Sequence, residues 1–197
     1  MTDATERLDR RELVAAVLAA VPDALVVTGL GSPSYDVFAA APERAGIFYL
    51  WGAMGGAVPT GLGLALAQPD KQVIVVTGDG EMLMGIGSLG TVAVQQPANL
   101  TILVLDNGHY GETGMQQSHS SQGADLTAIA SAFGIPATLR LTVPSDVADL
   151  AKRIASQSGP LFAQALIATG DMPRAMPSRD GVGVKNAFRA HLGLPSF

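Results

Sequence analysis

The sequence has 197 residues and a formal net charge of −5; 48% of its residues are hydrophobic and only 15% are charged. This length suits one domain with a sizeable core, and the acidic balance without a basic patch argues against nucleic acid as a partner. There is no cysteine, which excludes disulfides, thiolate zinc sites and iron–sulfur ligation within this chain. Apolar runs stay well short of the ~20 residues of a membrane span, and the polar start lacks the apolar segment of a signal peptide. We therefore expect a cytoplasmic protein with no membrane partner.

Apolar runs of strand length alternate with helical patterns along the whole chain. A flexible tail is expected over residues 1–8, before a helix that begins at a capping box with Asp9 as N-cap and Glu12 at N3. Further helices are expected over 35–41, 58–67, 81–95, from the cap Asp125 to 133, from the cap Ser145 to 158, and over 185–192; strands are expected over 24–28, 47–50, 73–77, 100–105, 137–143 and 161–168. The alternation predicts a single α/β domain over residues 1–197, built as a three-layer α/β/α sandwich with a mainly parallel sheet.

Glycines and a long polar loop stand out against this pattern. Gly61 and Gly63 suggest that helix 58–67 packs closely against a neighbouring backbone. Each glycine within 81–95 costs about 1 kcal/mol of helix propensity, so packing must hold that helix. The polar segment 108–123 shows no periodicity, and a loop of that length in a compact domain is usually functional or mobile.

Two of the expected strands end in polar clusters that contain glycine. One strand stops at Gly78-Asp79-Gly80, and another stops at Asp106-Asn107-Gly108. Ligands of an open parallel sheet bind just beyond the carboxyl ends of its strands. An Asp-Gly pair at one strand end is a common turn, but the two ends together offer a carboxylate from Asp79, an amide oxygen from Asn107 and a carbonyl oxygen from His109. The pattern predicts a site for a divalent metal and a diphosphate.

The chemistry of these groups suits magnesium. Mg²⁺ prefers near-octahedral oxygen coordination, with one or two carboxylates completed by phosphate oxygens and water. Gly80 would let the backbone approach a phosphate, and the amides at the start of the helix at Glu81 would supply N–H donors and the positive end of the helix dipole.

The spacing of these residues resembles the thiamin-diphosphate motif of the 2-oxo acid decarboxylase superfamily. The sequence GDG is followed after 26 residues by Asn107 and then by Tyr110-Gly111. The motif often ends in two asparagines, and Asp106 occupies the first of these positions here. The resemblance implies that Asp79, Asn107 and the carbonyl of His109 hold Mg²⁺.

The glycine-rich loop WGAMGG at 51–56 gains a meaning from the same resemblance, although alone it is equally well a tight turn. In the family, a bulky apolar residue at the position of Met54 wedges between the two cofactor rings and bends the cofactor, and the carbonyl at Gly52 receives the aminopyrimidine. A loop matching Gly31 and Ser32 also touches the diphosphate, although capping explains these residues as well. The implied cofactor contacts are Gly31, Ser32, Gly52, Ala53, Met54, Gly78, Asp79, Gly80, Glu81, Asn107, His109, Tyr110 and Gly111, and the catalytic candidates are Met54 and His119.

The resemblance covers nearly the whole chain but only half of the usual enzyme. Full-length members carry a second domain that binds the pyrimidine ring and supplies an activating glutamate, so a partner subunit and a hetero-oligomer are implied. The arrangement looks most like the beta subunit of sulfopyruvate decarboxylase, and the segment from Tyr110 to His119 resembles that of the phosphonopyruvate decarboxylases. The implied reaction is decarboxylation of a small acidic 2-oxo acid to CO₂ and an aldehyde.

Other interpretations remain open at this stage. The chain could belong to another thiamin-diphosphate enzyme, either a carboligase of the acetolactate-synthase type or a split oxidoreductase, although the latter usually brings cysteine-ligated clusters. It could also be a non-catalytic cofactor-binding subunit. His109 and His119 are proton-shuttle candidates or solvated loop histidines. Arg140, Arg174 and Arg179 could pair with a sulfonate or phosphonate, but no spacing ties them to the site.

Overall fold

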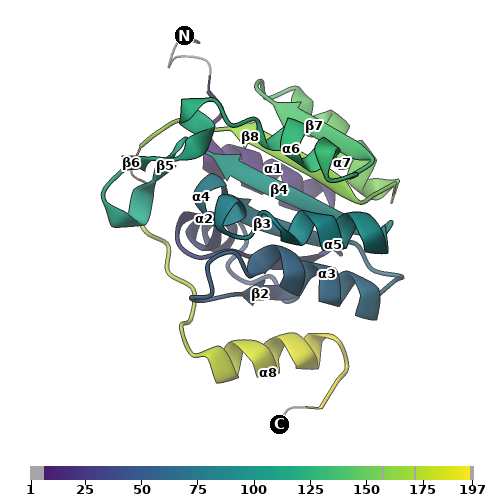
Figure 1. Cartoon of the computed structure of the whole chain (residues 1–197). Coiled ribbons are helices and arrows are strands. Elements are labelled where there is room, and N and C mark those ends of the chain that lie inside the picture. Colours follow the sequence, from purple (N-terminus) through teal and green to yellow (C-terminus); the bar gives the residue numbers. More distant parts are fainter. Residues whose placement is uncertain (1–6, 157, 171, 196–197) are drawn as a thin grey trace.

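The computed structural model describes residues 7–156, 158–170 and 172–195, and one parallel sheet dominates this part of the chain (Figure 1). Its six strands follow the order β2-β1-β3-β4-β8-β7, and every neighbouring pair is parallel. The strands are β1 Leu25–Thr28, β2 Ile47–Tyr49, β3 Val73–Gly78, β4 Leu100–Asp106, β7 Ala137–Leu141 and β8 Leu161–Leu166. The expected parallel α/β architecture is confirmed.

Helices cover both faces of the sheet, because successive strand residues point to opposite sides and both sides are apolar. In β3, for example, Ile74 and Val76 belong to one buried cluster while Val73 and Val75 belong to the other. The first cluster is covered by α1 Arg10–Ala20, α2 Ser32–Ala40 and α7 Asp146–Ala155; the second is covered by α3 Ala57–Ala67, α4 Asp79–Met84, α5 Ser88–Gln95 and α6 Leu126–Ala132. This gives the predicted three layers.

The last helix lies at the edge of the sheet beside β2 (Figure 1). Helix α8 spans Gly181–His191 and begins at Asp180, whose carboxylate accepts a hydrogen bond from the Val182 amide at 3.1 Å. Its Phe188 meets Phe48 of β2 edge-on, with ring centroids 5.7 Å apart. The expected start at residue 185 was therefore too late, because the cap is Asp180.

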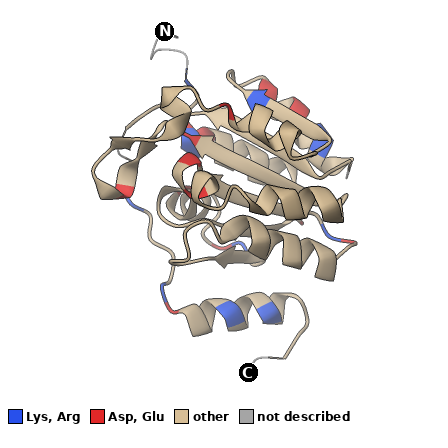
Figure 2. Ribbon diagram, viewed as in Figure 1, with Lys and Arg blue, Asp and Glu red and all other residues tan. Residues whose placement is uncertain are grey.

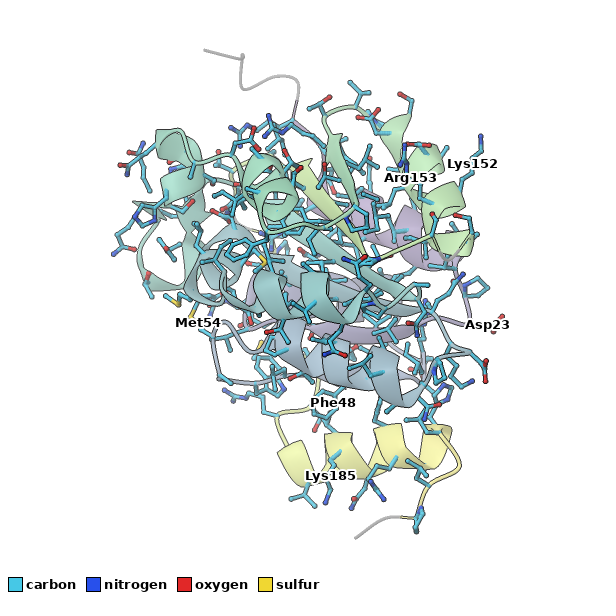
Figure 3. The ribbon with its side chains drawn as sticks, turned by 45° about the vertical axis from the view of Figure 1, so that its right-hand side comes forward. Asp23, Phe48, Met54, Lys152, Arg153 and Lys185 are labelled. Carbon is cyan, nitrogen blue, oxygen red and sulfur yellow. The ribbon has the colours of Figure 1, made fainter. Side chains whose placement is uncertain are left out.

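Strand register brings the polar strand ends to one edge. Thr28 pairs with Val76 two residues before Gly78, and Gly78 pairs with Leu105 one residue before the end of β4. Figure 3 shows Met54 at this end of the molecule and Asp23, which precedes β1, at the opposite end. The sheet therefore gathers the GDG cluster, the residues after β4 and the loop that carries Met54 at its carboxyl edge.

The single helix expected over 81–95 is wrong, because the chain forms two helices. Helix α4 ends at Met84 and α5 begins at Ser88. The break lies where two backbones touch: a Cβ atom at Gly85 would lie 2.3 Å from the carbonyl oxygen of Gly55. Glycine at both positions allows the loop before α3 to pack directly on the end of α4.

The polar segment 108–123 is more ordered than its composition indicated. It contains a short antiparallel ladder, β5 His109–Tyr110 with β6 Gln116–Gln117, and two 3₁₀ turns, η2 Gly111–Thr113 and η3 His119–Gln122. Hydrogen bonds of the hairpin and of the turns order this segment, although its sequence has no hydrophobic periodicity. The segment folds over the carboxyl edge of the sheet.

Other element ends also differ from expectation. The strands expected to reach residues 143 and 168 end at Leu141 and Leu166, and the helix expected to reach 158 ends at Ala155. Leu8 is buried and bridges to Ile167 in parallel, so the proposed tail ends before it, whereas residues 1–6 lie outside the described part of the chain. Helix α2 begins at Ser32 rather than at 35, because Pro33 suits the first turn of a helix. Ser145 makes no side-chain cap at α7; the carboxylate of Asp146 accepts from two preceding amides instead.

Among the residues that the structure describes, there is no helix with both the length and the apolar character needed to cross a membrane. The cytoplasmic location stays a prediction.

Two glycines of α3 make a matched test of the packing of helix on sheet. A Cβ atom at Gly61 would lie 2.1 Å from Cγ2 of Val75, whereas Gly63 has open space around it, so the close packing expected at Gly63 was wrong. We expect Gly61→Ala to lower the free energy of unfolding by about 1–3 kcal/mol through overpacking. Gly63→Ala should raise it by up to about 1 kcal/mol, because alanine favours the helix.

Urea unfolding of both variants measures these changes. A stable Gly61→Ala protein would show that α3 does not rest on β3 as described.

Candidate functional site

A cavity of about 390 Å³ lies at the carboxyl edge of the sheet. It is bounded by the end of β3, the start of α4, the residues after β4, the start of α2 and the loop before α3. Of the residues proposed from the sequence, those that line it are Ser32, Met54, Gly78, Asp79, Gly80, Glu81, Asn107, His109, Tyr110 and Gly111. Segments distant in sequence thus meet at one site, as the strand-end pattern predicts.

Four proposed residues do not line the cavity. Gly31 precedes α2 with φ +75°, and a Cβ atom there would lie 2.9 Å from Cγ of Glu112. Gly52 and Ala53, both with positive φ, shape an exposed turn before Met54. His119 is exposed on η3 and is not brought together with the others. The structure therefore gives no geometric support for His119 as a proton donor.

Asp79 is the buried acidic group of the site. Its Oδ2 accepts hydrogen bonds from the hydroxyls of Ser118 and Ser120, the latter at 3.2 Å. Burial, reinforced by the negative charge of nearby Asp106, raises the pKa of Asp79 to about 6. A cation at this position would favour the charged form of Asp79 and offset the cost of burying it.

Asp106 is held by a network of its own. It accepts hydrogen bonds from the Gly108 amide at 2.9 Å, the Ser120 hydroxyl at 2.7 Å and the Gln164 amide nitrogen at 2.6 Å. Ser120 therefore bridges the two carboxylates of Asp79 and Asp106. These serines could not be singled out from the sequence, because they lie in a polar segment without periodicity.

The donor set fits a hard divalent cation that shares its shell with phosphate. Asp79, Asn107 and His109 line the same cavity and offer oxygen atoms of three kinds. The Asn107 side chain is held by the His109 amide, which donates to Oδ1 at 2.8 Å. Within the described residues, no cluster of three or more His, Cys, Asp or Glu side chains could hold a metal alone. A site with one carboxylate, completed by neutral oxygens and a diphosphate, agrees with that composition.

Gly80 has no side chain at the point where the ring of Tyr110 packs. A Cβ atom here would lie 2.3 Å from Cε1 of Tyr110. The Tyr110 ring therefore rests on the first turn of α4. This contact places β5 against the start of that helix and closes one side of the cavity.

Glu81 joins three segments of the site from within. Its Oε2 accepts hydrogen bonds from the Leu30 amide at 3.1 Å and from Oγ1 of Thr77 at 2.9 Å. Burial raises the pKa of Glu81, and the bonds from Thr77 and the Leu30 amide, together with the nearby Ala57 and Gly55 amides, partly oppose this. Its other oxygen, Oε1, is buried without a hydrogen-bond partner. Glu81 thus positions the loops after β1 and before α3, a role that differs from the direct cofactor contact suggested by the family resemblance.

Methionine side chains form the rim of the cavity. Met54, which is labelled in Figure 3, and Met84 line it with 42% and 59% of their surfaces exposed. Met115 is exposed nearby, and a Cβ atom at Gly111 would lie 3.8 Å from its sulfur. Met54 follows a turn closed by the Gly56 amide on the Ala53 carbonyl at 2.7 Å. Exposed large apolar side chains around a cavity are typical of a surface that another molecule covers.

The three arginines considered as anion partners lie in different places. Arg174 pairs with Glu112, a residue of the cavity wall, at 3.2 Å, and lies 5.9 Å from the ring centroid of Tyr35. Arg140 pairs with Asp125 at 2.5 Å in a separate polar cavity of about 280 Å³. Arg179 is exposed.

Arg10 and Asp36 also belong to the cavity wall, and sequence reasoning missed both. Arg10 is 7% exposed and Asp36 is fully buried, and their side chains form an ion pair. Arg10 follows the cap of α1 in the sequence, where it resembles an ordinary residue of a first helical turn. No motif pointed to it.

The fold and site together define a parallel α/β domain with a cavity at the carboxyl edge of its sheet, where sheets of this kind bind their ligands. Residues 33–165 match the family described as "Thiamine pyrophosphate enzyme, C-terminal TPP binding domain". The chain belongs to this family, and thiamin diphosphate is the cofactor that the family domain binds.

Individual relatives agree with this membership. The chain is 38% identical over 185 residues to a phosphonopyruvate decarboxylase of Streptomyces viridochromogenes, covering 91% of this chain and 45% of that protein. It is 40% identical over 129 residues to the sulfopyruvate decarboxylase subunit beta of Methanothermobacter thermautotrophicus, covering 64% of this chain and 67% of that subunit. The chain therefore spans less than half of the first relative and about two thirds of the second.

A solved structure supports the fold. The thiamine diphosphate-dependent 4-hydroxybenzoylformate decarboxylase of Rhodococcus jostii RHA1 superposes with a TM-score of 0.72 at 23% identity, covering 85% of this chain and 34% of that chain.

The anchoring role of Glu81 can be tested by a double-mutant cycle. A Cβ atom at Gly29 would lie 1.7 Å from Oε2 of Glu81, so Gly29→Ala should displace the carboxylate and lower the free energy of unfolding by about 1–3 kcal/mol. In a Glu81→Ala background the same change should cost less than about 1 kcal/mol, because the obstructing oxygen is gone. Additive losses in urea unfolding would contradict the role.

Proposed function

We propose that this chain is the diphosphate-binding subunit of a thiamin-diphosphate-dependent carboxy-lyase. Its substrate would be a small acidic 2-oxo acid of the sulfopyruvate or phosphonopyruvate kind, and its products CO₂ and an aldehyde. The names of the two relatives described above support the reaction and the substrate class. The observation that carries the proposal is the joining of Asp79, Asn107 and Met54 around one cavity.

In this proposal the residues of this chain bind the metal and the diphosphate and orient the cofactor. Asp79, Asn107 and the His109 carbonyl would hold Mg²⁺, with Gly80 and the first turn of α4 turned toward the diphosphate. Met54 would contact the rings of the cofactor at the rim of the cavity, and the Gly52 carbonyl, in the exposed turn before Met54, would accept a hydrogen bond from its aminopyrimidine. When bound, the thiazolium ring supplies the electron sink for loss of CO₂.

A partner subunit completes the site in this proposal. The two glutamates that line the cavity are already engaged, Glu81 with Leu30 and Thr77, and Glu112 with Arg174. The pyrimidine ring would need its activating glutamate from a second chain with a pyrimidine-binding domain. The exposed methionine rim around Met54 is the surface that such a chain would cover.

Metal dependence tests the cofactor site directly. Thermal unfolding of the chain should shift upward by about 5–10 °C when Mg²⁺ and thiamin diphosphate are added at roughly 100 times their Kd. Asp79→Ala should abolish the shift, because the metal loses its charged ligand. Asp70→Asn, a change at an exposed turn, is the matched control and should retain it. An unchanged shift in Asp79→Ala would refute the assignment of Asp79 to the metal.

Activity tests the reaction. Co-expression with a partner chain that carries a pyrimidine-binding domain should give CO₂ release from sulfopyruvate, phosphonopyruvate or both. No release from either substrate by an assembled, cofactor-loaded complex would refute the substrate class. Release that survives Asp79→Ala would instead indicate that the site in this chain is non-catalytic.

The role of Met54 has a separate measurement. In the cofactor-loaded complex, Met54→Gly should slow exchange of the cofactor C2 proton at least about tenfold, because the reacting groups lose their alignment. Binding of Mg²⁺ and diphosphate should be largely unchanged. Met84→Gly, at the other exposed methionine of the cavity, is the control, and equal exchange rates in both variants would count against the wedge.

A further inference from the structure

Arg10 brings a buried positive charge to the wall of the cavity. It is the first residue of α1, and its side chain is 7% exposed. Nε donates to Oδ1 of Asp36 at 3.2 Å and lies 3.0 Å from Oδ2. Asp36 lies one turn after Ser32 in α2, and all three residues line the cavity. The guanidinium is therefore held beside the start of α2 by a single contact through Nε.

The rest of the Arg10 guanidinium has no protein partner in the described part of the chain. Only Nε takes part in the hydrogen bonds and ion pairs of this side chain. A guanidinium carries five N–H donors, four of them on the two terminal nitrogens. These donors are not among the described polar atoms that are fully buried without a hydrogen-bond partner, so they are open to the space of the cavity, where an acceptor can reach them. Their position in the cavity wall indicates that the acceptor is a ligand.

The charge around Arg10 favours an anion. Asp36 is also contacted by Arg11, whose Nε lies 3.4 Å from Oδ1. With Asp36 ionised, the three side chains carry one net positive charge; with Asp36 protonated they carry two. The cluster is therefore positive in either state.

Arg11 provides a comparison within the same cluster. It shares Asp36 with Arg10, but its terminal nitrogen Nη2 donates to the carbonyl of Pro173, and 26% of its side chain is exposed. It is not among the residues that line the cavity. The two arginines thus differ in whether their terminal nitrogens are free to meet a ligand there.

We propose that Arg10 binds the terminal phosphate of the cofactor diphosphate through its two terminal nitrogens. The inference rests on the function proposed above and adds a charged diphosphate contact supplied by α1. A guanidinium matches phosphate oxygens in a bidentate pair, and such pairs are the stronger class of hydrogen bond. The diphosphate is favoured over the substrate's second acid group because Arg10 is buried beside the start of α2, where Ser32 is expected to meet the diphosphate.

Isothermal titration of the full chain with Mg²⁺-pyrophosphate and with Mg²⁺-thiamin diphosphate tests the proposal. Arg10→Gln should weaken both ligands by roughly 10- to 100-fold, which corresponds to a lost charged hydrogen-bond pair. Arg10→Lys, which keeps the charge without the fork, should weaken them less. Arg11→Gln should bind within about twofold of the wild type.

A double variant controls for loss of affinity that is caused by misfolding. Arg10→Gln with Asp36→Asn removes the buried pair together, and it should show the same loss of pyrophosphate affinity at a thermal midpoint close to that of the wild type. Unchanged pyrophosphate affinity in folded Arg10 variants would overturn the proposal while leaving the proposed function intact. A wild-type chain that binds neither ligand would overturn both.

A substrate-like probe tests whether Arg10 binds the cofactor diphosphate or the second acid group of the substrate. Sulfoacetate carries a sulfonate and a carboxylate but no diphosphate. If Arg10→Gln lost sulfoacetate binding and kept pyrophosphate binding, the arginine would belong to the substrate's acid group, and the assignment to the diphosphate would be wrong. We expect the pyrophosphate affinity to change.

Discussion

One buried carboxylate holds the carboxyl edge of this molecule together. Glu81 accepts hydrogen bonds from the loop after β1 and from the end of β3, and the amides at the start of α3 lower its pKa against the effect of burial. These three segments form much of the cavity wall. Because a Cβ atom at Gly29 would collide with this carboxylate, glycine is required there for the arrangement. The direct packing of Gly55 on Gly85 then fixes the loop that carries Met54.

Two carboxylates, Asp79 and Asp106, are buried at the same edge, where an ionised group is costly unless other groups stabilise it. The negative charge of Asp106 disfavours the ionisation of Asp79, and serines of the segment that follows β4 donate hydrogen bonds to both carboxylates. Arg10, which also lines the cavity, is held in place by Asp36. Figure 2 shows that acidic and basic ribbon segments lie near one another at this end of the sheet. An acidic centre beside a basic wall is the charge pattern that a metal–diphosphate pair would complement.

Much of this could be predicted from the sequence because it depends on local rules. Continuous apolar runs fixed the strands, and polar residues after two of them placed Asp79 and Asn107 at the site. Two kinds of feature could not be predicted from the sequence. The break between α4 and α5 depends on a tertiary contact between glycines 30 residues apart in sequence, which helix propensity does not report. Arg10 carries no motif, and Ser118 was not singled out within the segment that resembles the family. Their roles arise only when α1 and the segment after β4 fold against the cavity and Asp79.

The central claim is that Asp79 and Asn107 hold a divalent metal that bridges to a diphosphate. The most direct measurement is a crystal structure of the chain with Mn²⁺ and thiamin diphosphate, in which the anomalous signal locates the metal. The account predicts one peak at about 2.0–2.3 Å from oxygens of both residues and of the diphosphate, since Mn²⁺ accepts the same hard oxygen ligands as Mg²⁺. A peak away from Asp79, or a diphosphate bound outside this cavity, would contradict it.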